Sequence, residues 1–160
     1  MTDFPLTIRR ATAADLADIV RLMADDVLGQ SRERNENPLP QAYRNAFAEI
    51  DADPRHELIV VEREGRVIAT LHLTELVSLT RVATRRMEVE AVRVQADLRG
   101  RWIGERMMRW AIERAREKGC GTLQLTSDAR RTEAHAFYTR IGFEVSHVGM
   151  KLSIGHETSA

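Results

Sequence analysis

A glycine-containing turn near the middle of the 160-residue chain has the residues of an anion-binding loop. The turn reads RGRWIG from Arg99 to Gly104 and precedes a stretch with helical periodicity. The first backbone N–H groups of a helix have no intrahelical partner and carry partial positive charge, so phosphate groups bind there. Gly100 and Gly104 allow a ligand to approach the backbone, and Arg99 and Arg101 offer charge-assisted hydrogen bonds. The alternative is ordinary turn chemistry, because glycine is common where a strand turns into a helix.

Two carboxylates precede this turn on the same side of a predicted strand. Glu88 and Glu90 are two residues apart, and alternate residues of a strand project to one face. A carboxylate in such a place can act as a general base. Because Arg85, Arg86 and Arg93 are close in sequence, surface ion pairs are the alternative interpretation of both glutamates.

Other reaction classes lack their characteristic residues. Cys120 is the only cysteine, which excludes an internal disulfide and a cysteine-based zinc site. The five histidines show no metal-ligand spacing such as His-Glu-x-x-His, and the nucleophile elbow Gly-x-Ser-x-Gly is absent. The triphosphatase loop Gly-x-x-x-x-Gly-Lys-Ser/Thr is also missing. We therefore expect no metal, no serine or cysteine nucleophile and no nucleoside triphosphatase activity.

The overall composition is typical of a globular protein. Apolar residues make up 43% of the chain and charged residues 30%, and the formal net charge is zero. A chain of this length can form one core but not two, so we expect a single domain over residues 1–160. The interspersed charges give no general attraction to nucleic acid or to a membrane surface. Because no signal-peptide pattern or membrane-spanning apolar run occurs, the expected location is cytoplasmic.

Hydrophobic periodicity predicts the elements that must position these residues. Before the turn, it predicts strands at 6–10, 58–62, 67–73 and 87–94 and helices at 12–23 and 41–50, with a polar loop at 29–40. After the turn, it predicts a helix at 103–117, a strand at 122–127, a helix at 134–141 and final strands at 143–145 and 150–154. This order describes a mixed α/β sheet in which the helix after the turn is a crossover between parallel strands.

Three segments together resemble the signature of the GCN5-related N-acetyltransferase (GNAT) superfamily. They are Val92-x-Val94, the turn that begins five residues later, and Ala134-His135-x-Phe137-Tyr138-x-x-x-Gly142-Phe143. The element order agrees over nearly the whole chain. The similarity is strongest from Glu88 to Phe143, where the sequence resembles the aminoalkylphosphonate N-acetyltransferase branch. The resemblance implies a mixed, mostly antiparallel central sheet of about seven strands, with helices on both faces, splayed between the fourth and fifth strands.

The resemblance also implies that acetyl-coenzyme A (acetyl-CoA) binds in this gap as a co-substrate. Its pantetheine arm would pair with the backbone from Val92 to Val94, and amides from Gly100 to Glu105 would hold the pyrophosphate. The cofactor-binding residues so implied are Val92, Arg93, Val94, Arg99, Gly100, Arg101, Trp102, Ile103, Gly104, Glu105, Asp128 and His135. Trp102 departs from the family pattern because a glycine is usual there, and tryptophan does not freely adopt a positive φ. Asp128 stands where asparagine is common.

By the same resemblance, an amine attacks the thioester directly, with no covalent enzyme intermediate. A primary ammonium has a pKa of about 10, so a carboxylate must first remove its proton. Glu90 matches a glutamate of many superfamily members and Glu88 one of the phosphonate branch, and we slightly prefer Glu90. Tyr138 is the candidate acid that protonates the departing thiolate. The alternative is a core aromatic beside Ala134 and Phe137.

We therefore expect an N-acetyltransferase that acts on a primary amine of a small molecule or amino acid. The alternatives are acetylation of a protein or peptide amine, and a non-catalytic acyl-CoA sensor or interaction domain. The segments expected to cover the acceptor, 29–40 and 76–86, match no pattern. Arg81, Arg85 and Arg86 suit an anionic amine, unless they are simply solvated. We also consider a homodimer, because the last predicted strand offers a sheet edge.

Overall fold

Five strands form one mixed sheet in the order β1-β2-β3-β4-β5, in a computed structural model that describes residues 5–155. The strands are β1 (Thr7–Arg10), β2 (His56–Arg63), β3 (Arg66–Val77), β4 (Arg85–Val94) and β5 (Thr122–Leu125). The first four pair antiparallel, and β5 pairs parallel with β4. The mixed, mostly antiparallel sheet is confirmed, but the described residues contain five strands and not about seven.

The helices agree with the periodicity, with two additions. They are α1 (Leu16–Ala24), α2 (Val27–Gln30), α3 (Gln41–Ala52), α4 (Thr80–Ala83), α5 (Ile103–Glu117) and α6 (Thr132–Arg140), with 3-10 turns at Ala13–Asp15 and Ala96–Leu98. The short α2 and α4 were not predicted, because four residues carry too little periodicity. No helix within residues 5–155 is long and apolar enough to cross a membrane.

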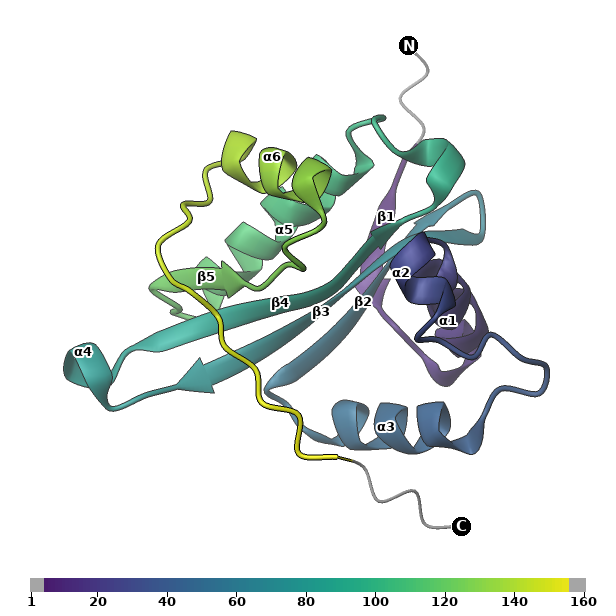
Figure 1. Ribbon diagram of the computed structural model, residues 1–160, viewed down its shortest axis with the longest axis horizontal. Coiled ribbons are helices and arrows are strands. Elements are labelled where there is room, and N and C mark those ends of the chain that lie inside the picture. The colour runs from purple at the N-terminus through teal and green to yellow at the C-terminus, as the bar shows by residue number, and fades with distance from the viewer. Residues whose placement is uncertain (1–4, 156–160) are drawn as a thin grey trace. The chain divides into compact units, whose positions relative to one another are not determined.

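Helices cover both faces of the sheet. Figure 1 shows α1 and α3 on one side and α5 on the other. On the first side, Ile19 and Leu22 of α1 cluster with Val60 of β2, and Phe47 of α3 packs against them. On the other side, α5 contributes a buried apolar stripe, Ile103, Met107, Met108, Ala111 and Ala115, as its periodicity predicts. Burial of apolar surface therefore holds helices against both faces of the sheet.

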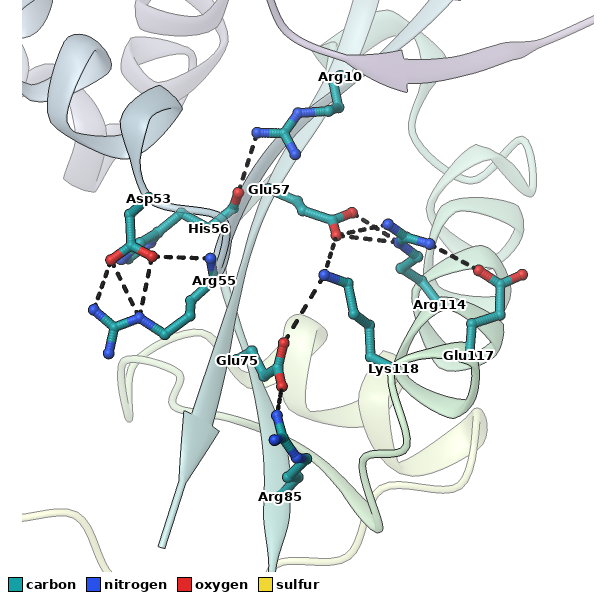
Figure 2. Close-up of polar contacts among 10 residues, drawn as sticks. All are labelled: Arg10, Asp53, Arg55, His56, Glu57, Glu75, Arg85, Arg114, Glu117 and Lys118. Carbon is teal, nitrogen blue, oxygen red and sulfur yellow. Dashed lines mark hydrogen bonds and ion pairs between the residues drawn. The ribbon is translucent and has the colours of Figure 1, made fainter.

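A buried carboxylate joins the sheet to α5 (Figure 2). Glu57 of β2 is only 4% exposed and accepts hydrogen bonds from Arg114 Nε at 2.9 Å and Nη2 at 2.8 Å. Lys118 Nζ lies 3.2 Å from Glu57 and 3.9 Å from Glu75, which pairs in turn with Arg85. Burial alone raises the pKa of Glu57, but the hydrogen bonds from these cations bring that pKa below its ordinary value. The network fixes α5, whose N-terminus is the predicted anion site.

The chain groups into two compact units, of which the first ends at Leu125 and the second begins at Thr126. In the described part of the second unit, α6 is the only helix and no strand forms. The strands predicted at 143–145 and 150–154 are therefore wrong, and Val145, Val148, Met150, Leu152 and Ile154 are exposed. Their apolar alternation shows which face a strand would bury, but a strand also needs a neighbour to pair with. A single domain over residues 1–160 stays a prediction.

Candidate active site

From Glu90 onward, one edge of β4 is no longer paired with β5. Residues Arg86 to Val89 pair in register with Thr122 to Leu125 of β5, and the pairing stops there. From Glu90 to Val94, β4 has a partner only in β3 among the described residues. A strand edge without a neighbour offers free N–H and C=O groups to an extended ligand. The short pairing is compatible with the splayed sheet that the family resemblance implies.

A bulge interrupts β4 directly after Glu90. Ala91 has a φ of 50°, and the register with β3 shifts between the pairs Glu90–His72 and Arg93–Thr70. Arg93 Nη1 also donates to the carbonyl of Val92 at 2.8 Å. Bulges and left-handed residues other than glycine are concentrated at functional sites, where they change the direction of the backbone. The backbone from Val92 to Val94, expected to bind the pantetheine arm, therefore begins at an irregular point of the strand.

The turn before α5 leaves its amides without a side-chain cap. Gly100 has a φ of +76°, and apart from its two chain neighbours no residue has a heavy atom within 4 Å of the position that a Cβ would occupy. Trp102 has a φ of 65°, so the expectation that tryptophan would avoid this region is not met, and the residue is 68% exposed. Trp102, the N-cap residue of α5, makes no side-chain cap hydrogen bond to the first turn, where Ile103 and Gly104 are the first two residues. These amides fit an anionic group such as a pyrophosphate.

The charged residues of the turn differ in how they are engaged. Arg99 Nε donates to the carbonyl of Val94 at 3.0 Å and Arg99 Nη2 to that of Asp25 at 3.0 Å, so this guanidinium holds the turn to the end of β4. Glu105 accepts a hydrogen bond from Arg109 Nη2 at 2.7 Å. Arg101 is exposed and has no polar partner in the described part of the chain. Of the two arginines expected at the phosphates, Arg101 is the one that is free.

The two glutamates belong to a polar row across the sheet. His56, Thr74, Glu88 and Gln124 stand directly opposite one another on β2, β3, β4 and β5. Glu88 accepts a hydrogen bond from the Gln124 side chain. Glu90 is exposed, stands opposite His72 and has no polar partner among the described residues. Glu90 is therefore the more available base.

Histidines occupy the same face beside Glu90. His72 Nε2 lies 2.9 Å from His56 Nδ1, and Thr74 Oγ1 lies 3.2 Å from the same Nδ1. Burial and, secondly, the charge of His56 lower the pKa of His72 to about 4, so His72 is neutral at neutral pH. Sequence analysis missed both histidines. They are sixteen positions apart, and only the hairpin register brings them together.

The remaining predicted residues belong to the second unit. The carboxylate of Asp128 accepts from Arg130 Nε at 2.9 Å and Nη2 at 2.8 Å, and its backbone oxygen lies 3.0 Å from His135 Nε2. These contacts hold the turn that leads into α6. The half-buried ring of Tyr138 meets Phe137 and Phe143 edge to face, at centroid distances of 5.2 and 5.7 Å. Roles for Asp128, His135 and Tyr138 at the glutamates stay predictions.

Comparisons with known proteins identify a matching family and several relatives of the chain. Residues 22–143 match the model of the acetyltransferase (GNAT) family. An aminoalkylphosphonate N-acetyltransferase of Salmonella typhimurium is 30% identical over 140 residues, which cover 88% of this chain and 86% of the relative. Glucosamine 6-phosphate N-acetyltransferase 1 of Oryza sativa subsp. japonica is 31% identical, over 89% of this chain and 86% of its own. A crystal structure described as a transcriptional regulator from Bacillus halodurans C-125 has a TM-score of 0.90 and 44% identity, covering 93% of this chain and 99% of its own.

Proposed function

The chain belongs to the acetyltransferase (GNAT) family, and from this premise we propose that it acetylates a primary amine of a small molecule or amino acid by direct attack. The observation that carries the proposal is the place of Glu90. This unpaired carboxylate stands where β4 loses its β5 partner and bulges. A base is thus located next to a strand edge that can receive an extended acyl donor.

The donor is acetyl-CoA, which this family uses. The residues that would hold it are the backbone from Val92 to Val94 for the pantetheine arm and the amides that open α5 for the pyrophosphate. Arg101 would add a charge-assisted contact to the phosphates. The uncapped helix start and the open space at Gly100 support this fit. The donor supplies a thioester, whose carbonyl carbon is open to attack by an amine.

The acid and base follow from the proton balance of the reaction. The acceptor enters mostly as an ammonium, and Glu90 takes one proton so that the nitrogen lone pair can attack the thioester carbon. As the carbon–sulfur bond breaks, the thiolate leaves and takes a proton from the Tyr138 hydroxyl, and the second proton that the nitrogen must lose to become an amide restores that hydroxyl. Glu88, engaged by Gln124, serves as a second carboxylate beside the ammonium. The product amide and free coenzyme A then depart.

The acceptor that we propose is a small amine that also carries an anionic group. Two relatives support this class. The Salmonella enzyme is named for aminoalkylphosphonates and the rice enzyme for glucosamine 6-phosphate, and both names describe an amine with a phosphorus-acid group.

The homodimer considered from the sequence stays a prediction.

The test is release of free thiol from acetyl-CoA in the presence of an amine panel. The panel contains 2-aminoethylphosphonate, glucosamine 6-phosphate, several amino acids, an uncharged alkylamine and a lysine peptide. We expect release with at least one small anionic amine and none with the peptide. Preference for the peptide would contradict the proposed acceptor class. A chain that coenzyme A stabilises against heat but that releases no thiol with any amine would favour the non-catalytic sensor.

A further inference from the structure

Two imidazole rings lie in the middle of the face that carries Glu90. His56 of β2 and His72 of β3 approach to 2.9 Å between ring nitrogens, with ring centroids 5.0 Å apart. Since β3 lies between β2 and β4, His72 contacts His56 on one side and stands opposite Glu90 on the other. Side chains directly opposite each other on antiparallel strands have Cβ atoms about 5 Å apart. His72 is therefore within reach of a small ligand at Glu90.

The contact between the rings occupies one of the two nitrogens of His72. Nε2 is engaged with His56 Nδ1, and a bond between two ring nitrogens needs a proton on only one of them. The other nitrogen, Nδ1, has no hydrogen-bond partner among the described residues. It is also absent from the side-chain atoms that are both buried and without a hydrogen bond, so solvent or a ligand reaches it. When Nε2–H is the donor, Nδ1 presents a lone pair.

We propose that His72 is a binding residue for the acceptor amine, whose N–H group donates a hydrogen bond to the lone pair of His72 Nδ1 while Glu90 takes the reacting proton. A primary amine that has given up one proton keeps two N–H groups, and its own lone pair must point at the thioester carbon. Two acceptors on the enzyme, the unprotonated oxygen of Glu90 and His72 Nδ1, would fix those N–H groups and so orient the lone pair.

The charge of His72 suits this role. Burial and His56 keep the imidazole neutral at neutral pH, and a neutral ring does not repel an incoming ammonium. The charged groups on the same face of β4 are Glu88, Glu90, Arg86 and, beyond the bulge, Arg93, and the Asp53–Arg55 pair lies just before His56. Glu90 stands directly opposite His72, with Glu88 one pair to one side and Arg93 one pair to the other, so the charge nearest to an amine at His72 is a carboxylate. The inference rests on the proposed function, because it needs an amine to bind at Glu90.

The test compares His72→Phe, which keeps a ring without nitrogen, with His72→Asn, whose Oδ1 replaces the Nδ1 acceptor. We expect His72→Phe to lower kcat/KM for the amine by about tenfold or more, because the amine loses a hydrogen-bond acceptor. The KM for acetyl-CoA should not change. His72→Asn should recover most of the loss. Leu58→Ala, at the residue opposite His72 on β2, is the matched control and should lower stability without changing kcat/KM.

A second measurement does not depend on activity. Nitrogen-15 NMR of the ring in the wild-type protein should show His72 protonated at Nε2 and not at Nδ1. A proton on Nδ1, or wild-type kcat/KM in His72→Phe, would overturn the inference while leaving the acetyltransferase intact. Wild-type protein that transfers acetyl to no amine would overturn the proposed function, and the inference with it.

Discussion

Arg85 and Arg86 are consecutive residues of β4 that face opposite sides of the sheet. Arg85 pairs with Glu75 in the charge network beneath α5 (Figure 2). Arg86 stands between Leu76 and Thr122, on the face of Glu88, and is half-buried without an ion-pair partner within residues 5–155. Two residues along a strand span about 7 Å. A bound amine at the glutamates could thus present an anionic group to Arg86.

Arg86→Ala should weaken selection for anionic acceptors. A charge-assisted hydrogen bond contributes about 1.5–3 kcal/mol, so kcat/KM for 2-aminoethylphosphonate should fall about 10- to 100-fold, with little change for an uncharged alkylamine. Arg85→Ala is the control next to it and should lower thermal stability but keep the acceptor preference. Equal losses for anionic and uncharged amines would argue against an anion site at Arg86.

The two glutamates should respond differently to neutralisation. Glu90→Gln should lower kcat at pH 7 by about 100-fold, because a general base contributes about 10²–10⁴ in rate. The defect should shrink as the pH rises to about 10, where about half of the amine is already deprotonated in solution. Glu88→Gln should cost less than about tenfold, because Glu88 is engaged by Gln124. A pH–rate profile of each variant provides the measurement, and the reverse ranking would make Glu88 the base.

Tyr138→Phe tests the acid while keeping the packing. The ring contacts with Phe137 and Phe143 do not need the hydroxyl, so the melting temperature should change little. We expect kcat to fall about 100-fold at saturating acetyl-CoA, with the affinity for coenzyme A unchanged. The effect should shrink with an acyl donor whose thiol is more acidic, since that leaving group needs less help. Full turnover in Tyr138→Phe would remove this residue from the mechanism.

Some of this site is predictable because it depends on local order. Glu88 and Glu90 both belong to β4. Alternation along a strand places them on one face of the sheet, whichever strands pair with β4. The helix start at Ile103 follows equally from local periodicity and an adjacent turn. The proximity of His72 to Glu90 is different, because it depends on the register between β3 and β4. No local pattern specifies that register, and the bulge at Ala91 shifts it.

Local rules also failed in two informative places. Trp102 adopts a left-handed conformation that single-residue preference disfavours, because the turn between Gly100 and α5 requires it. The residues around Val145 and Ile154 have the alternation of strands but are exposed and unpaired. Periodicity describes what a residue run could bury, and pairing depends on a partner elsewhere in the chain.

The substitution Trp102→Gly tests whether the left-handed conformation of Trp102 matters for stability or for coenzyme A binding. A left-handed residue other than glycine costs about 1–2 kcal/mol, and glycine removes that strain but adds about 0.5–1 kcal/mol of chain entropy on unfolding. The unfolding free energy should therefore rise by no more than about 1.5 kcal/mol. Coenzyme A affinity, measured by calorimetry, should stay within about threefold, because the amides carry the binding. A tenfold loss would show that the indole contacts the ligand.

Glu57→Gln should be among the most destabilising single changes in the sheet. Removing one partner of a buried ion network costs about 3–5 kcal/mol, because Arg114 and Lys118 would face a neutral group. Glu117→Gln is the matched control, since Glu117 bonds the same Arg114 at 3.0 Å but its side chain is 64% exposed. It should cost less than about 1 kcal/mol. Urea unfolding at pH 7 distinguishes the two.

Acid should remove the difference between wild type and Glu57→Gln. The pKa of Glu57 is lower in the folded protein than in the unfolded chain, so its stabilisation is complete above the unfolded pKa of about 4.3. That stabilisation is lost as the pH falls through the folded pKa. Wild type should therefore lose stability more steeply than Glu57→Gln below about pH 4.3, while Glu117→Gln follows wild type. Parallel curves for wild type and Glu57→Gln would show that Glu57 does not ionise differently in the fold.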